Sequence, residues 1–301
     1  MRNPAPFVFT AVLAGSAAYL SAVSKAPAAD AAPAEAPKEA VTPAVGGGDK
    51  APEAKPAKDV VWPQDASDIP ADSKITFGKL PNGLRYIILP NKEPQKRVSL
   101  RIHIAAGALE EQEDQRGLAH FMEHMVFNGT KHFKEGELVP KMQRLGVGFG
   151  AHVNAYTSWD ETVYMLDLPD LSDETVGLGF NVMRDFGDGA NLEPSEIDRE
   201  RGVILSEKTS RDSVRFRLME QQFNTLFSGS LIAKRFPIGL EEVIKTAPRE
   251  RFTDFYTRFY TPDRMTFVVV GDIDPAAAEA ALAIHQIEAP EPHELAVEAG
   301  G

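Results

Sequence analysis

The sequence predicts an α+β fold in which a mostly antiparallel mixed sheet is flanked by helices. Ile75 to Leu80 and Leu84 to Leu89 lie on either side of Pro81-Asn82-Gly83, which is typical of a β-hairpin with Asn-Gly at its tip. Val98 to Ala105 alternates apolar and polar residues, as a half-buried strand does. Helical segments are interleaved with such strands, but the hairpin favours an α+β fold over a doubly wound sheet.

The remaining elements follow in chain order. Apolar residues at helical spacing predict a helix over 117–127, with Leu118, Phe121, Met122 and Met125 in the core. Val163 to Leu168 is expected to form a strand, and Pro194 begins a long helical stretch that reaches about Phe227, since proline suits the first turn. The last expected elements are a helix over 249–259, an apolar strand over 265–270 and a helix over 275–284.

Composition excludes several classes of protein. The 301 residues contain no cysteine, which rules out disulfides, thiolate catalysis and iron–sulfur clusters. Any metal ion must therefore be held by histidine and carboxylate. The net charge of −12 and the absence of a basic run argue against nucleic acid as a partner.

The N-terminal segment has the pattern of a secretory signal peptide. Arg2 is followed by an uncharged, apolar stretch from Phe7 to Val23, and Ala26-Pro27-Ala28 offers small residues for cleavage. We assign residues 1–28 to this signal, or to an anchor if it is not cleaved; only then is a membrane a partner. Either interpretation predicts a periplasmic or secreted protein.

Composition also sets the expected domain boundaries. Residues 29–59 are rich in Ala, Pro, Glu and Lys and bury too little apolar surface to fold, so a disordered linker is expected there. Residues 60–287 are expected to form one domain with a substantial core. Residues 288–301 return to Pro, Glu, Ala and Gly and are expected to be a frayed tail.

The strongest indication of function is the pentapeptide His120-Phe121-Met122-Glu123-His124, which has the pattern H-x-x-E-H. On a helix the two histidines are one turn apart, so both rings leave the same face and can bind one ion such as zinc. Glu123 projects at an adjoining angle, where it can take a proton from a water molecule without being a ligand. The alternative interpretation is a surface helix that carries two histidines by chance.

A third ligand is expected from a carboxylate on another helix. Glu200 and Glu207 stand seven residues apart, which on a helix of about 3.6 residues per turn is nearly the same direction. Both can therefore face the histidine helix, one as a ligand and the other as a hydrogen-bond partner of a ligand histidine. The residues alone leave open which glutamate has which role.

Together these segments resemble the pitrilysin family of inverted-motif zinc peptidases, which includes insulin-degrading enzyme, the mitochondrial processing peptidase and bacterial periplasmic peptidases. The resemblance extends over about residues 74–282. Beyond the block around the histidines and the Glu-Arg-Gly-Val-Ile…Glu block, it is carried by Leu80-Pro81-Asn82-Gly83-Leu84, by 153–164 and by 259–272.

The resemblance implies a zinc-dependent metalloendopeptidase that cleaves peptides or unfolded proteins. By position, it implies that His120, His124 and Glu207 are zinc ligands and that Glu123 is the general base. Glu200 matches the acid that supports a ligand, and we retain it as the alternative third ligand. Asn154 and Ala155 resemble the strand that pairs with an extended peptide substrate.

Family members build their active chamber from two halves, and this chain resembles only the first, metal-binding domain. We therefore expect a second family subunit or a C-terminal half as the partner that completes the enzyme. The alternative hypothesis is a truncated or non-catalytic peptide-binding or assembly partner of the same fold. A third hypothesis is a structural cell-envelope protein in which the pentapeptide is accidental.

Overall fold

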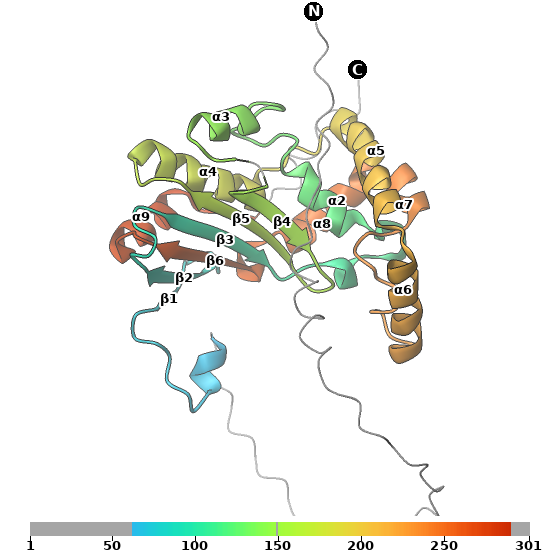
Figure 1. Ribbon diagram of the computed structural model, residues 1–301, viewed down its shortest axis with the longest axis horizontal. Coiled ribbons are helices and arrows are strands. Elements are labelled where there is room, and N and C mark those ends of the chain that lie inside the picture. Colours follow the sequence, from blue (N-terminus) through green and yellow to red (C-terminus); the bar gives the residue numbers. More distant parts are fainter. Residues whose placement is uncertain (1–61, 149, 290–301) are drawn as a thin grey trace, which may run out of the picture. The chain divides into compact units, whose positions relative to one another are not determined.

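The computed structural model describes residues 62–148 and 150–289 (Figure 1). Of these, residues from Ser73 onward belong to one compact unit, and residues up to Asp72 belong to another, which contains the 3-10 helix η1 (Pro63–Ala66). The predicted signal segment, the linker at 29–59 and residues 290–301 of the expected tail lie outside the described residues. In the part that is described, no helix combines the length and the apolar character needed to cross a membrane.

The compact unit is organised around one mixed sheet of six strands in the order β1-β2-β6-β3-β5-β4. Only β2 and β6 are parallel, and the other neighbouring pairs are antiparallel. This confirms the predicted α+β class and the mostly antiparallel sheet. The strands are β1 (Thr76–Lys79), β2 (Arg85–Pro90), β3 (Val98–Ile104), β4 (Val153–Thr157), β5 (Thr162–Leu168) and β6 (Met265–Gly271).

The predicted hairpin is confirmed as β1 and β2. Gly83 has a φ of 100°, a backbone conformation that favours glycine. The side-chain oxygen of Asn82 accepts a hydrogen bond from the Leu84 amide at 3.1 Å, and its Nδ2 donates to the Ile287 carbonyl at 2.7 Å. The turn therefore also ties the end of the domain to its beginning.

Helices α2 and α5 carry the residues of the predicted metal site, and two further helices agree with expectation. The predicted helices at 249–259 and 275–284 are α8 and α9. The helices are α2 (Leu118–Met125), α3 (Leu138–Arg144), α4 (Asp173–Asp188), α5 (Pro194–Arg211), α6 (Val214–Leu226), α7 (Glu241–Thr246), α8 (Arg249–Phe259) and α9 (Pro275–Ile284). Short 3-10 helices are η2 (Ala108–Glu110), η3 (Glu113–Gln115) and η4 (Pro262–Arg264).

The long helix expected from Pro194 to Phe227 is wrong in one respect, because it is two helices. Asp212 leaves the helical conformation with a ψ of 99°, and Ser213 is extended with a ψ of 162°. The Ser213 hydroxyl accepts a hydrogen bond from the Phe216 amide at 3.1 Å and so caps α6. Serine satisfies a free amide at a helix start better than it supports a helix interior.

Helix α4 is not among the helices that the sequence analysis predicts, and its glycines lower the intrinsic helix propensity of the segment. The structure gives Gly179 a packing role. A Cβ at this position would lie 2.7 Å from Cδ2 of Leu168 on β5. Glycine therefore lets α4 lie close against the sheet, and burial of Phe180 and Phe186 from the same helix supplies the stabilisation that propensity does not.

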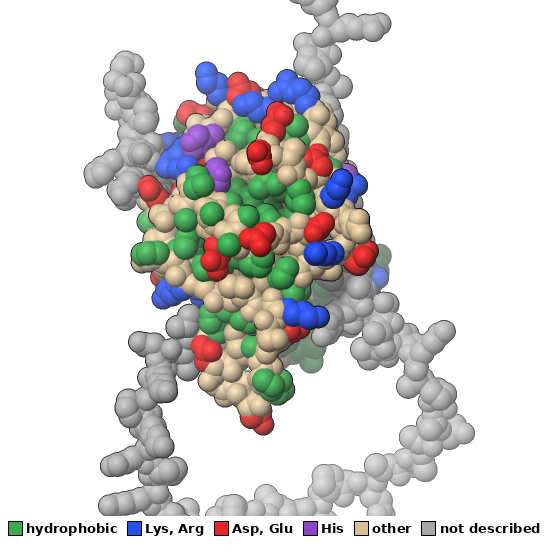
Figure 2. All heavy atoms as spheres, turned by 90° about the vertical axis from the view of Figure 1, so that its left-hand side faces the viewer, with side chains coloured by type: hydrophobic (Ala, Val, Ile, Leu, Met, Phe, Trp, Pro, Cys, Tyr) green, Lys and Arg blue, Asp and Glu red, His purple; other side chains and the backbone are tan. Residues whose placement is uncertain are grey.

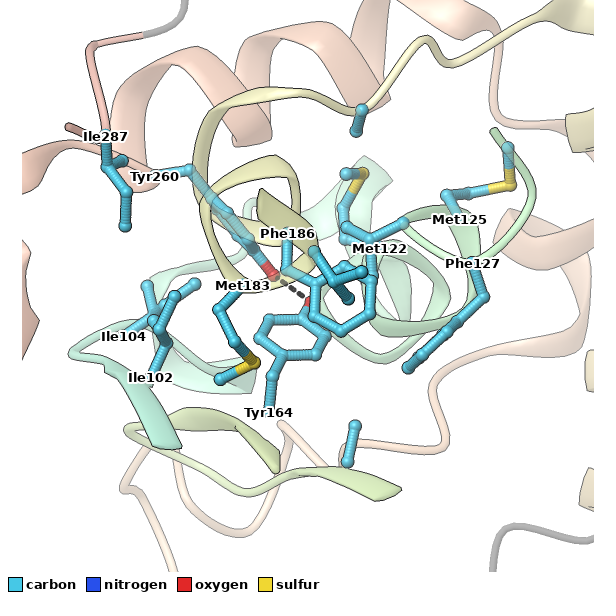
Figure 3. Close-up of a cluster of buried hydrophobic side chains, with 14 of the residues drawn as sticks. Ile102, Ile104, Met122, Met125, Phe127, Tyr164, Met183, Phe186, Tyr260 and Ile287 are labelled. Atoms are coloured by element: carbon cyan, nitrogen blue, oxygen red, sulfur yellow. Dashed lines mark hydrogen bonds between the residues drawn. The ribbon is translucent and has the colours of Figure 1, made fainter. Parts of the chain in front are cut away.

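The core lies between the sheet and helices α2, α4 and α8. Figure 3 shows Met122 and Met125 of α2 gathered with Phe186 of α4 and with Tyr164 of β5, whose hydroxyl lies 2.8 Å from that of Tyr260. The predicted core positions of α2 are all buried, which confirms them: Leu118, Phe121, Met122 and Met125. The core thus holds α2 firmly against the sheet.

The opposite face of the sheet is partly exposed and carries both polar and apolar side chains. On β3, Ser99 and Arg101 alternate with buried residues, and Arg101 Nη1 lies 2.9 Å from Asp167 on β5. Acidic and basic side chains are scattered on the side of the molecule that Figure 2 shows, without one continuous patch of either sign. Helices cover one face of the sheet, and the residues of the predicted metal site lie on that covered side. Asn154 is in register with Met165 and Arg101 and so belongs to the opposite face.

Candidate metal centre

Helix α2 carries three polar residues through the protein interior. It begins after Gly117, and all eight of its residues are buried. His120, Glu123 and His124 are each only 4% exposed. Buried ionisable groups are costly unless they are paired or bind a metal ion, so each of these side chains calls for a partner.

The partners come from helix α5, which lies beside α2 (Figure 1). Glu207 Oε1 is 3.6 Å from His120 Nε2, and Glu207 Oε2 is 3.4 Å from His124 Nε2. One ligand atom from each of the three residues lies within 4.8 Å of the others. The two imidazoles and the carboxylate therefore face a common point, although they come from two helices far apart in sequence.

Glu200 has a different place from Glu207. Its Oε1 accepts a hydrogen bond from His124 Nδ1 at 2.8 Å, and its Oε2 accepts one from Asn128 Nδ2 at 2.7 Å. Glu200 thus uses both oxygens in hydrogen bonds and fixes the His124 ring with Nε2 toward Glu207. This is how a carboxylate orients a histidine that binds a metal ion through its other nitrogen.

The electrostatic surroundings of the two histidines differ. Burial, together with the nearby charge of His124, lowers the pKa of His120 to about 3, so its ring is neutral at pH 7. Burial would also lower the pKa of His124, but the hydrogen bond to Glu200 and the contact with the Glu207 carboxylate outweigh it and raise the pKa to about 9. Without a metal ion, His124 is therefore protonated at pH 7 and carries a positive charge.

Glu207 completes this charge balance. Burial acts to raise its pKa, but the contact with His124 and the charge of Arg211 outweigh burial and lower it, so it stays ionised. The Arg211 guanidinium, one turn further along α5, forms an ion pair with Glu207 Oε1. The centre thus presents a carboxylate and a neutral imidazole, both of which are good ligands for zinc.

Glu123 lies beside these groups without joining them. Its Oε2 accepts a hydrogen bond from the Thr157 hydroxyl at 2.7 Å, at the end of β4. Burial raises the pKa of Glu123, although the charge of His124 and the Thr157 hydrogen bond partly offset this. A carboxyl group with a raised pKa is a stronger base when ionised, which suits it to accept a proton at neutral pH.

Sequence analysis gave no role to three residues that the structure brings to the centre, Asn128, Thr157 and Arg211. Arg211 lies four residues after Glu207, an ordinary helical ion-pair spacing that the sequence does reveal. No spacing in the sequence indicates a role for Asn128 or Thr157 at the centre. Their contacts depend on how the segment after α2 and strand β4 pack against the helices.

Asn154 and Ala155 lie on β4, which is an edge strand of the sheet and, among the residues that the structure describes, pairs with β5 alone. Asn154 is half-buried, and its side-chain oxygen accepts a hydrogen bond from the Ala155 amide at 2.9 Å. The strand lies beside α2 and ends at Thr157, the partner of Glu123 (Figure 1). An edge strand with open backbone groups is a site at which an extended peptide can add a further strand.

The donor set fits a zinc ion. Zinc favours two or three nitrogen ligands with a carboxylate and keeps one position open in catalytic sites. Here the shortest distances from Nε2 of either histidine to the Glu207 oxygens are 3.6 Å and 3.4 Å, longer than those of good hydrogen bonds. A cation between these atoms would satisfy groups that their mutual contacts satisfy poorly.

Comparison with known proteins is consistent with this centre. Residues 86–228 match the model described as Insulinase (Peptidase family M16), and residues 246–293 match that of the Peptidase M16 inactive domain. The probable zinc protease PqqL of Haemophilus influenzae is 38% identical over 208 residues, which are 69% of this chain and 22% of that protein. The chain thus spans about a quarter of the length of such relatives.

Solved structures agree in fold. The crystal structure of the periplasmic protease PqqL from Escherichia coli has a TM-score of 0.71 at 36% identity, over 74% of this chain and 25% of that one. The structure of the first half of the same protease matches with the same TM-score over 48% of its chain. These matches confirm the resemblance to pitrilysin-type peptidases that the sequence motifs indicated.

Proposed function

Since this chain belongs to the insulinase family of peptidases, M16, we propose that it is the metal-binding domain of a zinc metalloendopeptidase that hydrolyses peptides or unfolded proteins. The observation that carries this proposal is the approach of His120, His124 and Glu207 within 4.8 Å, directly beside a buried Glu123. The names of its relatives as zinc proteases support the choice of metal.

In this proposal His120, His124 and Glu207 hold the zinc ion. Zinc supplies Lewis acidity, which polarises a peptide carbonyl and makes a water molecule easier to deprotonate. Glu200 is not a ligand but holds His124 by its Nδ1, supported in turn by Asn128. Arg211 keeps Glu207 ionised and directed toward the histidines.

Glu123 is the proposed general base, which takes a proton from the attacking water and can pass it to the leaving amine. Three features support the role: Glu123 is on the same helix as the two histidines, it is buried, and the Thr157 hydroxyl holds one of its oxygens. Because Thr157 ends β4, the base and the edge strand are fixed relative to each other.

We further propose that an extended substrate pairs with the edge of β4 at Asn154 and Ala155. Backbone pairing would bring a peptide past Glu123 with little selection of side chains, as a peptidase of unfolded chains requires. Because the chain matches only about a quarter of its relatives, the proposed activity includes a partner, either a second family subunit or a C-terminal half. The signal-like N-terminus and the periplasmic location of E. coli PqqL support a periplasmic or secreted enzyme.

The test compares the wild type with Glu123→Gln, which keeps the shape of the side chain but removes the base. We expect both proteins to retain stoichiometric zinc after dialysis, whereas only the wild type cleaves a quenched peptide library in the presence of the remaining M16 domains. Glu110→Gln, on the same chain but outside the centre, is the matched control. A wild type that holds zinc and cleaves nothing, even with the partner half, favours the non-catalytic binding module. Loss of zinc from the wild type on dialysis would contradict both the peptidase and the binding module.

A further inference from the structure

The helix that carries the pentapeptide lacks a side-chain cap of its own. Its N-cap residue is Gly117, with a φ of 107°, and glycine has no side chain that can accept a hydrogen bond. A Cβ at this position would lie 2.9 Å from the Gly239 Cα, so close packing excludes a larger residue there. The free amides of the first turn must therefore find an acceptor elsewhere.

Glu111 supplies that acceptor from six residues upstream. Its Oε1 accepts hydrogen bonds from the Gly117 amide and from the Ala119 amide, each at 2.9 Å. The side chain is only 4% exposed. Its backbone carbonyl accepts from Nε of Arg235, a buried arginine that also pairs with Glu113 at 2.9 Å. Glu111 is thus itself held in place.

The two histidines differ in how they are oriented. The ring of His124 is fixed by a hydrogen bond from Nδ1 to Glu200. His120 has no equivalent, since its Nδ1 is buried without a hydrogen-bond partner among residues 62–148 and 150–289. His120 directly follows Ala119 in the first turn of α2. Its position opposite Glu207 therefore depends on the backbone of that turn.

We propose that Glu111 is a positioning residue for the metal centre, which holds the first turn of α2 and thereby places His120 opposite Glu207. The proposal rests on the metal site proposed above. Glu111 acts on the metal ion only through the backbone and does not touch substrate or the reacting atoms.

The electrostatics of Glu111 identify the best conservative variant. Burial raises its pKa to about 8, although hydrogen bonds from Ala119 and Gly117 and the charges of Arg235 and Arg116 partly offset the effect. The group is therefore largely protonated at pH 7, and Oε2 has no hydrogen-bond partner among the described residues. Glutamine has the same shape and the same Oε1 acceptor, so Glu111→Gln should preserve the contact.

The experiment measures zinc affinity by competition with a chelator and amide hydrogen exchange over 117–125 in the metal-free protein. We expect Glu111→Ala to weaken zinc binding by about 10–100-fold and to accelerate exchange of the Ala119 amide. Glu111→Gln should restore both values to those of the wild type. Glu110→Ala is the matched control, because Glu110 also accepts a backbone hydrogen bond, from Gly107 at 2.8 Å, but outside α2.

The outcomes separate this proposal from the proposed function. If Glu111→Ala does not fold, Glu111→Asp replaces it, because one methylene fewer withdraws the acceptor and should weaken zinc binding in the same direction. Unchanged zinc affinity in these variants, or equal losses in the alanine and glutamine variants, overturns the role of Glu111. If the wild type itself binds no zinc, the proposed function fails. In that case, exchange of the Ala119 amide that is the same in Glu111→Ala as in the wild type overturns the role of Glu111 independently.

Discussion

Among the described residues, two clusters combine histidine with a buried carboxylate, yet they are built differently. The candidate metal centre joins His120 and His124 of α2 to Glu207 of α5. The second cluster joins the segment after α2 to α4, where Asp185 is fully buried. Asp185 accepts hydrogen bonds from the Thr130 hydroxyl at 2.5 Å, the His132 amide at 3.0 Å and His132 Nδ1 at 2.6 Å.

The contrast lies in what each acid does. The oxygens of Asp185 are used by three short hydrogen bonds, so the second cluster is complete without an ion. In the metal centre, the distances from Glu207 to the two histidines are 3.6 Å and 3.4 Å, longer than good hydrogen bonds. The same residue types therefore form hydrogen bonds that hold the fold in one place and an arrangement suited to metal binding in the other.

The largest expected difference between the clusters is in metal content. His120→Ala removes one proposed ligand and should abolish stoichiometric zinc after dialysis, because two remaining ligands hold zinc weakly. His132→Ala should leave zinc content unchanged, since Asp185 and His132 already satisfy each other. Metal analysis of both variants checks this, and zinc loss from His132→Ala would contradict the distinction.

A smaller effect is expected at the residue that links a ligand to its support. Glu200→Gln should weaken zinc binding by about 10–100-fold without abolishing it, because glutamine keeps the hydrogen bond to His124 but lacks the charge. Chelator competition measures the affinity. If Glu200→Gln loses zinc as completely as His120→Ala, Glu200 is the third ligand instead of Glu207.

The second cluster should respond in stability instead of metal binding. Asp185→Ala leaves the donors of Thr130 and His132 without their acceptor, which should lower the free energy of unfolding by about 1–3 kcal/mol. The loss should be equal with and without zinc, and zinc affinity should not change. Denaturant unfolding at both zinc levels is the measurement, and a loss that appears only with zinc would connect the two clusters.

Glu111 is an intermediate case, with one oxygen fully used and the other without a partner among the described residues. Its pKa is raised from 4.5 to about 8, so the folded state binds an extra proton between these values. Its contribution to stability is therefore complete below pH 4.5 and is lost as pH rises through 8. Between pH 6 and pH 9, the free energy of unfolding of the metal-free protein should fall less for Glu111→Gln than for the wild type. Equal falls would contradict the raised pKa of Glu111.

Much of the fold could be predicted from local patterns. The Asn82-Gly83 turn, the alternation in β3 and the helical spacing of α8 and α9 each depend on neighbouring residues, and each is present. The patterns failed where packing overrides propensity. Gly179 weakens α4 as an isolated helix but lets it approach Leu168, and the break at Ser213 divides a stretch that looks continuous.

The sequence by itself determined that two histidines and a glutamate share one helix, and that two further glutamates share one face of another, because helical periodicity is local. Only the tertiary structure decided that Glu207 approaches both histidines while Glu200 binds the far side of His124. The two glutamates point in nearly the same direction from α5, so their roles depend on how α5 is placed along α2. That placement comes from the burial of side chains throughout the core, which no segment encodes alone.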